Sequence, residues 1–377
     1  MPRAVACLLL VGCGFSAPDI DLPDPTAADW WDPAYRHRRQ LEVTAGDVRP
    51  DGGYAGYTVR LAPLDPAALT GLREGCDDLR VVAFDGERWR EQPRHLLGCG
   101  TGALDLRFAL PVDLADGAAW REAFLYYDRE APPAPPAATG TAVYLWWDDG
   151  SADLAAAYTR GRMDAWLGTN HRNSIAWDPA GGYRFDTGDD SQDSQRRAVG
   201  ERDVLVEAEW MHTGCYTNNM QSGVCARVRI ASGTGGTESA DHYYCTSRAQ
   251  NPGCNNNDQH IYDGDIVKTD NERIALQGLD DPPPIVTDQW RKQALAVFGA
   301  GPTQLRFWDA DPSWPELATP PADALQATGQ DADSDHQGTG AAGVMITQDT
   351  GRFRNLVVRR YVEPEPAVAL LEEEQAR

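Results

Sequence analysis

Short runs in which apolar and polar residues alternate are the feature of this sequence that most constrains its fold. Leu104, Leu106 and Phe108 alternate with Asp105 and Arg107. A period of two places the apolar side chains on one face of an extended strand, so the run predicts a strand with one buried face. Comparable runs occur at 41–43, 57–61, 204–206, 224–230, 295–298, 305–308 and 356–358. With 36 glycines and 26 prolines to form turns, the pattern predicts an all-β protein built from sandwiches.

The net charge excludes one large class of partners. The 377 residues include 57 Asp and Glu against 34 Lys and Arg, which gives a formal charge of -23. The longest basic run is Arg36-His37-Arg38-Arg39. Non-specific binding to nucleic acid or to an anionic membrane surface requires clustered cations. We therefore expect no nucleic-acid partner.

The first residues have the pattern of an export signal. Arg3 precedes a short apolar run, which falls below the roughly 20 residues that a membrane-spanning helix needs. Leu10-Val11-Gly12-Cys13 resembles the lipobox of bacterial lipoproteins. The resemblance implies that 1–12 is a signal peptide and that Cys13 carries a lipid, the sole membrane contact. The sorting rules of that family favour the outer membrane or cell surface, because Gly14 follows Cys13. An ordinary cleaved signal is the alternative.

Six cysteines remain once those of the signal and of the lipid site are set aside. An even number in an exported chain predicts disulfides. Cys76 and Cys99 lie alone in the first half and are expected to pair. The other four allow three connectivities: Cys215, Cys225, Cys245 and Cys254. Pairing of near neighbours, 215 with 225 and 245 with 254, is the simplest. The lack of a C-x-x-C pair disfavours a zinc site.

Proline-rich and polar stretches divide the chain. Residues 13–29 are polar and predict a tether. A first structured region covers 30–131, and the adjacent prolines of 132–141 predict an extended linker. A larger region follows at 142–366. Its end is followed by 367–377, which the acidic composition predicts to be a charged tail.

Residues 30–36 read Trp-Trp-Asp-Pro-Ala-Tyr-Arg, strands are expected at 57–61 and 78–81, and 124–128 reads Phe-Leu-Tyr-Tyr-Asp. In these features the first region resembles the bacterial envelope module known as domain of unknown function 2341. That family normally closes with Tyr-Tyr-Gly, so Asp128 is a departure. The resemblance implies a small β-sandwich that occurs beside jelly-roll domains in surface proteins, and in some proteins beside channel subunits of the MotA/TolQ/ExbB type.

The second region opens with Asp-Asp-Gly at 148–150, continues with expected strands at 203–209 and 290–294, and closes with 343–346 and 351–359. These segments are similar to a laminin-G/concanavalin-A-like jelly roll. The combined expectation is an all-β chain in which a small β-sandwich precedes a larger concanavalin-like jelly roll. Neither resemblance determines a ligand.

Glu207 and Glu209 are the candidate catalytic residues. They lie two apart on an expected strand and therefore on one face, as in the carboxylate pairs of concanavalin-like glycosidases. The third carboxylate of that pattern is missing, which favours a non-catalytic interpretation. A glycoside hydrolase or lyase is the alternative. Gly-x-Ser-x-Gly, His-Glu-x-x-His and P-loop sequences are absent.

Structural calcium is the expected cofactor. One acidic loop has the alternate spacing of calcium ligands: Asp331, Asp333 and Asp335. It lacks the glycine and the closing glutamate of an EF-hand. The jelly-roll resemblance implies a second calcium position, at Asp148 or Asp149 with Asn355, where Asp is the more usual residue. Solvated acidic loops are the alternative.

The polar segment 213–262, which contains the four later cysteines, supplies the candidate ligand-binding residues: Tyr216, Asn218, Asn219, Tyr243, Tyr244 and Tyr262. A disulfide-bonded loop with Tyr and Asn can stack on a glycan and hydrogen-bond to it. We therefore expect a cell-envelope lipoprotein that binds a carbohydrate, another surface polymer or an envelope protein without catalysis. A structural partner of a TolQ/ExbB-type complex is a further hypothesis, from family resemblance.

Overall fold

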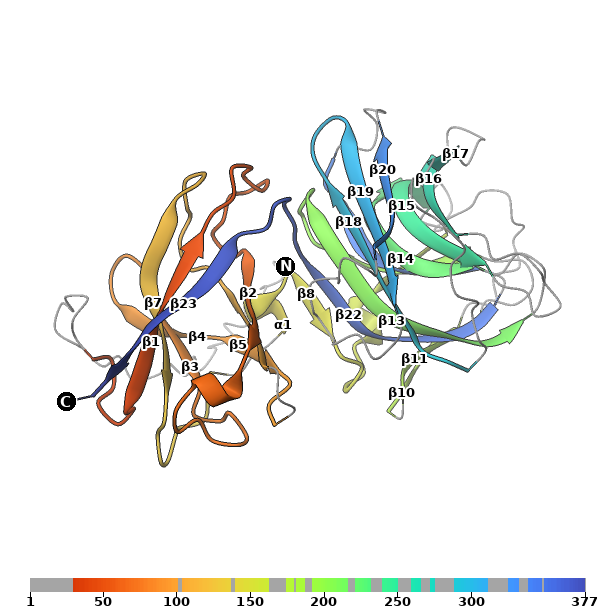
Figure 1. Cartoon of the computed structure of the whole chain (residues 1–377). Helices are drawn as coiled ribbons and strands as arrows, with labels where there is room; N and C mark the ends of the chain where they lie inside the picture. Colours follow the sequence, from red (N-terminus) through yellow and green to blue (C-terminus); the bar gives the residue numbers. More distant parts are fainter. Residues whose placement is uncertain are drawn as a thin grey trace, which may run out of the picture.

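The computed structural model describes residues 30–100, 104–136, 140–162, 174–179, 181–186, 192–215, 221–231, 239–249, 259–265, 272–274, 288–310, 325–331, 338–347 and 349–376. Within these ranges strands predominate, and the helices are short: η1 (Pro66–Ala68), α1 (Gly140–Val143) and η2 (Ala155–Ala157). The predicted all-β class is confirmed. Figure 1 shows two sandwiches side by side; the chain enters the second at β8 (Trp146–Asp148) and returns to the first between residues 360 and 367. None of the described helices is long and apolar enough to cross a membrane.

The first sandwich packs a five-stranded sheet on a three-stranded one. The larger sheet has the order β23 (Ala367–Gln375), β1 (His37–Thr44), β7 (Ala119–Tyr127), β3 (Arg80–Phe84) and β4 (Trp89–Gln92). The smaller has the order β2 (Thr58–Leu64), β6 (Leu104–Ala109) and β5 (Arg94–Leu97). Leu104, Leu106 and Phe108 are fully buried in the core between the sheets, as their alternation predicts.

The C-terminal segment corrects one expectation. Residues 367–377 read as a charged tail, but Ala367–Gln375 form β23, which pairs antiparallel with β1 from Thr44 to His37. Val368 and Leu370 pack against the core of the first sandwich. Further along, the acids take partners on β1, where Glu374 accepts hydrogen bonds from Arg38. The apolar alternation and the charge pairs together make a strand of a segment rich in acids.

The second sandwich is a jelly roll with an eight-stranded and a seven-stranded sheet. The first has the order β10 (Ser174–Asp178), β11 (Gly182–Asp186), β22 (Asp349–Arg360), β13 (Val204–Cys215), β18 (Arg291–Phe298), β19 (Thr303–Ala310) and β20 (Leu325–Asp331), and β8 also pairs with β22. The second has the order β14 (Gln221–Ala231), β21 (Ala341–Thr347), β12 (Gln192–Ala198), β9 (Thr159–Arg162), β15 (Ser239–Ala249), β16 (Gln259–Asp265) and β17 (Glu272–Ile274).

Alternation along β13 separates two environments. Val204, Val206 and Ala208 are buried in the core between the two sheets of the jelly roll. Glu207 and Glu209 therefore lie on the opposite, outer face of the eight-stranded sheet. That outer face also carries Lys292 and Arg354, which contact the two glutamates.

The predicted Cys76–Cys99 disulfide is present. Cys225, in β14, is also disulfide-bonded. The backbone register places it opposite Cys245 of β15. Cys254 lies outside the described residues.

Candidate functional site

Glu207 and Glu209 lie in a buried ion cluster on the outer face of the jelly roll. Glu207 and Glu209 are each only 2% exposed. Lys292 of β18 is fully buried, with its Nζ 3.2 Å from Glu207 Oε1 and 3.8 Å from Glu209 Oε1. Arg354 Nε donates to Glu209 Oε2 at 2.7 Å. The register causes this grouping, because Glu209 lies opposite Lys292 on one side and Arg354 on the other.

Among the described residues of this cluster, two cations lie beside two carboxylates. Buried carboxylates need such partners, because the loss of hydration is costly. A glycosidase needs a carboxyl group that can protonate the leaving group and a second one open to substrate. The arrangement of Glu207 and Glu209 therefore favours a structural role over the catalytic one.

Next to Glu209 the same face becomes accessible. The Arg354 side chain is 34% exposed, and its guanidinium carbon lies 4.2 Å from the centre of the Trp290 ring. Met211 of β13 lies opposite Arg352 of the neighbouring strand β22. Arg352 is ion-paired with Asp178. We call Met211, Trp290, Arg352 and Arg354 the Trp290 patch. It places an aromatic ring beside planar hydrogen-bond donors.

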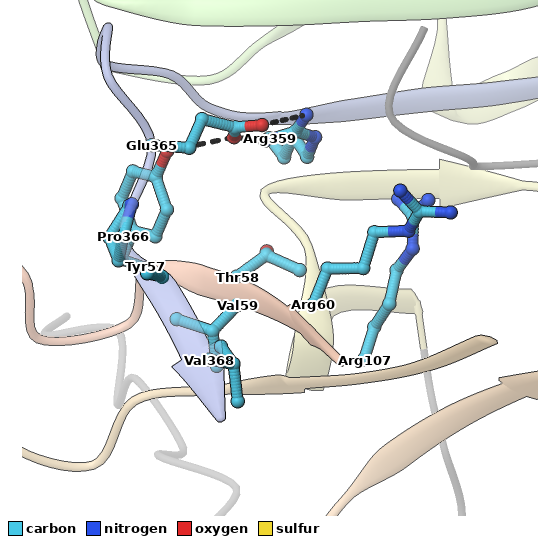
Figure 2. A pocket seen from close by; sticks show the side chains of 10 residues that line it. Tyr57, Thr58, Val59, Arg60, Arg107, Arg359, Glu365, Pro366 and Val368 are labelled. Atoms are coloured by element: carbon cyan, nitrogen blue, oxygen red, sulfur yellow. Dashed lines mark hydrogen bonds and ion pairs between the residues drawn. The ribbon is translucent and has the colours of Figure 1, made fainter. Parts of the chain in front are cut away.

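A cavity of about 380 Å³ lies between the two sandwiches. Its walls come from residues 57–60, from Arg107 of β6, from Arg359 of β22 and from residues 365–368, where the chain enters β23. Figure 2 shows arginine side chains on two sides of this space and Val59 with Val368 below it. Chain segments about 300 residues apart in sequence therefore meet at one site.

One wall of the cavity joins the sandwiches through a shared carboxylate. Glu365 Oε1 accepts hydrogen bonds from Tyr57 Oη at 3.0 Å and from Arg359 Nη1, and Oε2 accepts from Arg359 Nη2 at 3.2 Å (Figure 2). Burial raises the pKa of Tyr57 well above its ordinary value, and Glu365 adds to that. Burial alone would lower the pKa of Arg359, but Glu365 outweighs it and the pKa is raised. This wall is thus a neutral ion pair with a protonated phenol.

The opposite wall carries an excess of positive charge. Arg60 of β2 lies directly opposite Arg107 of β6, and His95 of β5 lies on the other side of Arg107. Like charges at opposed positions destabilise a sheet. Asp105 offsets part of the repulsion, because it accepts from Arg60 Nε at 2.9 Å and from Arg107 Nε at 3.3 Å. Burial lowers the pKa of Arg60 from its ordinary value, and Asp105 opposes that change.

His95 is neutral at physiological pH. Burial first and the neighbouring Arg107 second lower its pKa to about 4. Its Nδ1 lies 2.9 Å from the hydroxyl of Tyr144, and its ring lies 4.7 Å from that of Trp147. Among the described residues that line the cavity, this wall therefore carries two guanidinium groups against the carboxylate of Asp105.

The expected ligand-binding residues fall largely outside the described part of the chain. This holds for Tyr216, Asn218 and Asn219. Tyr243 and Tyr244 lie in β15 and Tyr262 in β16, where only the backbone is described. Cys13 also lies outside the described residues. Lipidation and the role of the 213–262 loops stay predictions.

Calcium at Asp148 stays a prediction, and both carboxylate oxygens of this residue accept hydrogen bonds within the fold. Its Oδ1 accepts from Gly150 N at 2.9 Å and its Oδ2 from Tyr158 Oη at 2.6 Å, so both oxygens already serve the fold. Asn355 is 8% exposed, with a positive φ of 53°. No group of three or more His, Cys, Asp or Glu within the described ranges is close enough to hold a metal. Asp331 ends β20, whereas Asp333 and Asp335 are not among the described residues, so calcium at that loop stays a prediction.

The sequence did not indicate the cavity or the Trp290 patch. Arg60 and Arg107 were visible only as polar positions in two alternating runs. Which strands become neighbours, and hence that these two residues oppose each other, depends on tertiary contacts. Glu365 lies between two prolines, which was the one local signal that the chain changes direction there.

No family model and no curated protein matches this chain. Among solved structures, it is similar to a carbohydrate-binding module, CBM66, from Bacillus subtilis, with 12% identity over 52% of this chain and 96% of that chain and a TM-score of 0.34. A Bacillus subtilis protein of unknown function with a galectin-like fold gives 8% identity over 58% of this chain and 96% of that chain, with a TM-score of 0.34. An engineered glycoside hydrolase of family GH43 gives 12% identity over 74% of this chain and 54% of that chain, with a TM-score of 0.32. At such identities and TM-scores these matches carry no inference about a ligand.

Proposed function

We propose that this protein is a non-catalytic lipoprotein of the bacterial cell envelope, whose jelly roll binds a carbohydrate or another surface polymer. The Trp290 patch carries the proposal. An aromatic ring can stack on the C–H face of a sugar ring, and a guanidinium can donate to its hydroxyl groups. The Trp290 ring and the Arg354 guanidinium lie together on the outer face of the eight-stranded sheet.

The position of Arg354 is fixed before any ligand binds. Its Nε donates to Glu209, which is itself buried beside Lys292. An ordered side chain loses less conformational entropy on binding. Glu209 would thus act as a positioning residue for binding and not as a catalytic carboxylate.

The test uses the full chain from residue 13 onward, with Cys13→Ser to keep it in solution, on immobilised polysaccharides. We expect retention on at least one polymer, and we expect Trp290→Ala to weaken it at least tenfold. Arg121→Ala, an exposed change on the first sandwich (63% exposed), is the matched control. If the folded protein is retained on no polymer, the proposal fails. Polymer turnover that is lost in Glu207→Gln would instead support the hydrolase or lyase alternative.

Membrane anchoring is tested separately. In a bacterial host the full chain should incorporate labelled fatty acid, and Cys13→Ala should abolish this incorporation. Equal labelling of the two proteins would contradict the assignment of Cys13 as the lipid site.

A further inference from the structure

The interdomain cavity has a charge opposite to that of the chain as a whole. The protein carries a formal charge of -23, yet one wall of the cavity places Arg60 and Arg107 against the single carboxylate of Asp105. The other wall is neutral, because Arg359 is paired with Glu365. The space between the walls therefore attracts an anion.

The two arginines also retain unused hydrogen-bond donors. Each guanidinium has five N–H groups. Within the described residues, Asp105 accepts from Nε of Arg60 and from Nε and Nη2 of Arg107. No described group accepts from Nη1 or Nη2 of Arg60. The Arg107 side chain is only 3% exposed, so water has little access to its N–H groups. A ligand oxygen in the cavity would give these donors an acceptor.

The rest of the cavity indicates a ligand that is more than a simple inorganic anion. Val59 and Val368 give an apolar floor, and the Tyr57 ring stands at one side (Figure 2). Glu365 provides carboxylate oxygens across the space from Arg60 and can accept from ligand hydroxyl groups. A volume of about 380 Å³ lies near the lower end of the roughly 300–1,000 Å³ of small-molecule sites. It suits one sugar-sized unit.

The cavity is open to solvent on one side. Arg60 has a side chain 28% exposed, and Ala367 at the start of β23 is exposed. A terminal or free sugar unit can therefore enter without separation of the sandwiches, while the deeper Arg107 remains shielded.

From these observations we infer that the interdomain cavity binds the carboxylate of one acidic sugar unit, a hexuronate, through Arg60 and Arg107. A planar guanidinium pairs with a carboxylate through two parallel hydrogen bonds. The choice of a sugar acid rests on the proposed function, whereas carboxylate binding does not. The unit can come as a free sugar acid or as the end of an acidic polymer.

The experiment is isothermal titration calorimetry on the Cys13→Ser chain from residue 13 onward. The probes are glucuronate and galacturonate, their neutral counterparts glucose and galactose, inorganic phosphate and sulfate, and an oligogalacturonate. We expect a uronate to bind, the neutral sugars to bind at least tenfold more weakly, and Arg60→Gln to weaken uronate binding at least tenfold. Arg121→Gln, an exposed arginine outside the cavity, should leave it unchanged. Comparison of the monomer with the oligomer distinguishes a free acid from a polymer end.

The inference is overturned if no uronate binds to the folded protein, if Arg60→Gln binds it as tightly as the parent, or if phosphate or sulfate binds more tightly than either uronate. Polymer retention without uronate binding would remove the cavity site and leave the proposed function intact. Uronate binding without retention on any polymer would remove the proposed polymer binding and leave the cavity site intact. Trp290→Ala should keep uronate binding, because that residue lies outside the cavity.

Discussion

At the scale of single residues, a buried lysine decides how Glu207 and Glu209 are interpreted. Lys292 is one of only two lysines in the chain, and it is fully buried between these carboxylates. Sequence spacing correctly placed the two glutamates on one face of a strand. It could not show that β18 brings a cation opposite them, because the two strands are about 80 residues apart.

We predict that Lys292→Met destabilises the jelly roll. The substitution leaves Glu207 and Glu209 buried without that cation, and the loss of one partner of a buried ion pair costs about 3–5 kcal/mol. Urea unfolding followed by tryptophan fluorescence measures the change. The triple variant Lys292→Met/Glu207→Gln/Glu209→Gln should recover part of it. A loss below about 1 kcal/mol in the single variant would show that the lysine is not needed to offset the carboxylates.

At the scale of elements, the sequence pattern wrongly predicted a charged tail where β23 forms. Val368 and Leu370 alternate with small residues in a weak strand pattern, but the run of acids after them favoured a tail. The partner strand is β1, more than 300 residues earlier in the sequence. No local signal announces such a pairing, because its stability comes from packing against the first core and from pairs such as His37 with Glu373.

Two neighbouring substitutions test β23. Leu370→Asp places a carboxylate against the core of the first sandwich and should lower the free energy of unfolding by about 1–3 kcal/mol. Ala369→Ser, at an exposed position of the same strand and without a charge opposite Glu42, should change it by less than about 0.5 kcal/mol. Hydrogen exchange of the β1 amides, which should become faster in Leu370→Asp alone, locates the effect. Equal behaviour of the two variants would contradict the docking of β23.

The register of β14 and β15 narrows the three disulfide connectivities left open by the sequence. Cys225 and Cys245 occupy opposed positions, and opposed Cα atoms in antiparallel strands are about 4.5–5.5 Å apart, within the range that a disulfide spans. We predict Cys225–Cys245, with Cys215–Cys254 as the remaining pair. Mass spectrometry of non-reduced peptides identifies the bonds, and a Cys215–Cys225 peptide would refute the prediction.

At the scale of the whole molecule, the alternation of apolar residues predicted the all-β fold and the sandwich architecture. It did not predict the contact between the two sandwiches. Tyr57, Arg107 and Glu365 belong to three separate segments, and only the packing of one sandwich on the other brings them to one cavity. The cavity site therefore depends on contacts between residues that are far apart in sequence.

The contact between the sandwiches should weaken in acid, through His95. Its pKa is about 4 in the folded protein, because of burial first and Arg107 second, against an ordinary value of 6.5. Below pH 6.5 the unfolded chain binds a proton that the folded chain does not, so this contribution to stability is complete above pH 6.5 and lost as the pH falls toward 4. Between pH 7 and 4.5, urea unfolding should show a smaller loss of stability in His95→Gln than in the parent. Equal losses would exclude His95 as a source of the acid sensitivity.

The position of β23 also changes how the attachment of the jelly roll is understood. Because the chain leaves the first sandwich after β7 and returns to it as β23 (Figure 1), the jelly roll is an insertion within the first sandwich and not an appendage at its end. Two covalent crossings hold it, so it cannot swivel freely as a domain on a single linker does. A polymer that pulls on the jelly roll would load both crossings, and the β1–β23 pair would bear that force in shear along its ladder of hydrogen bonds.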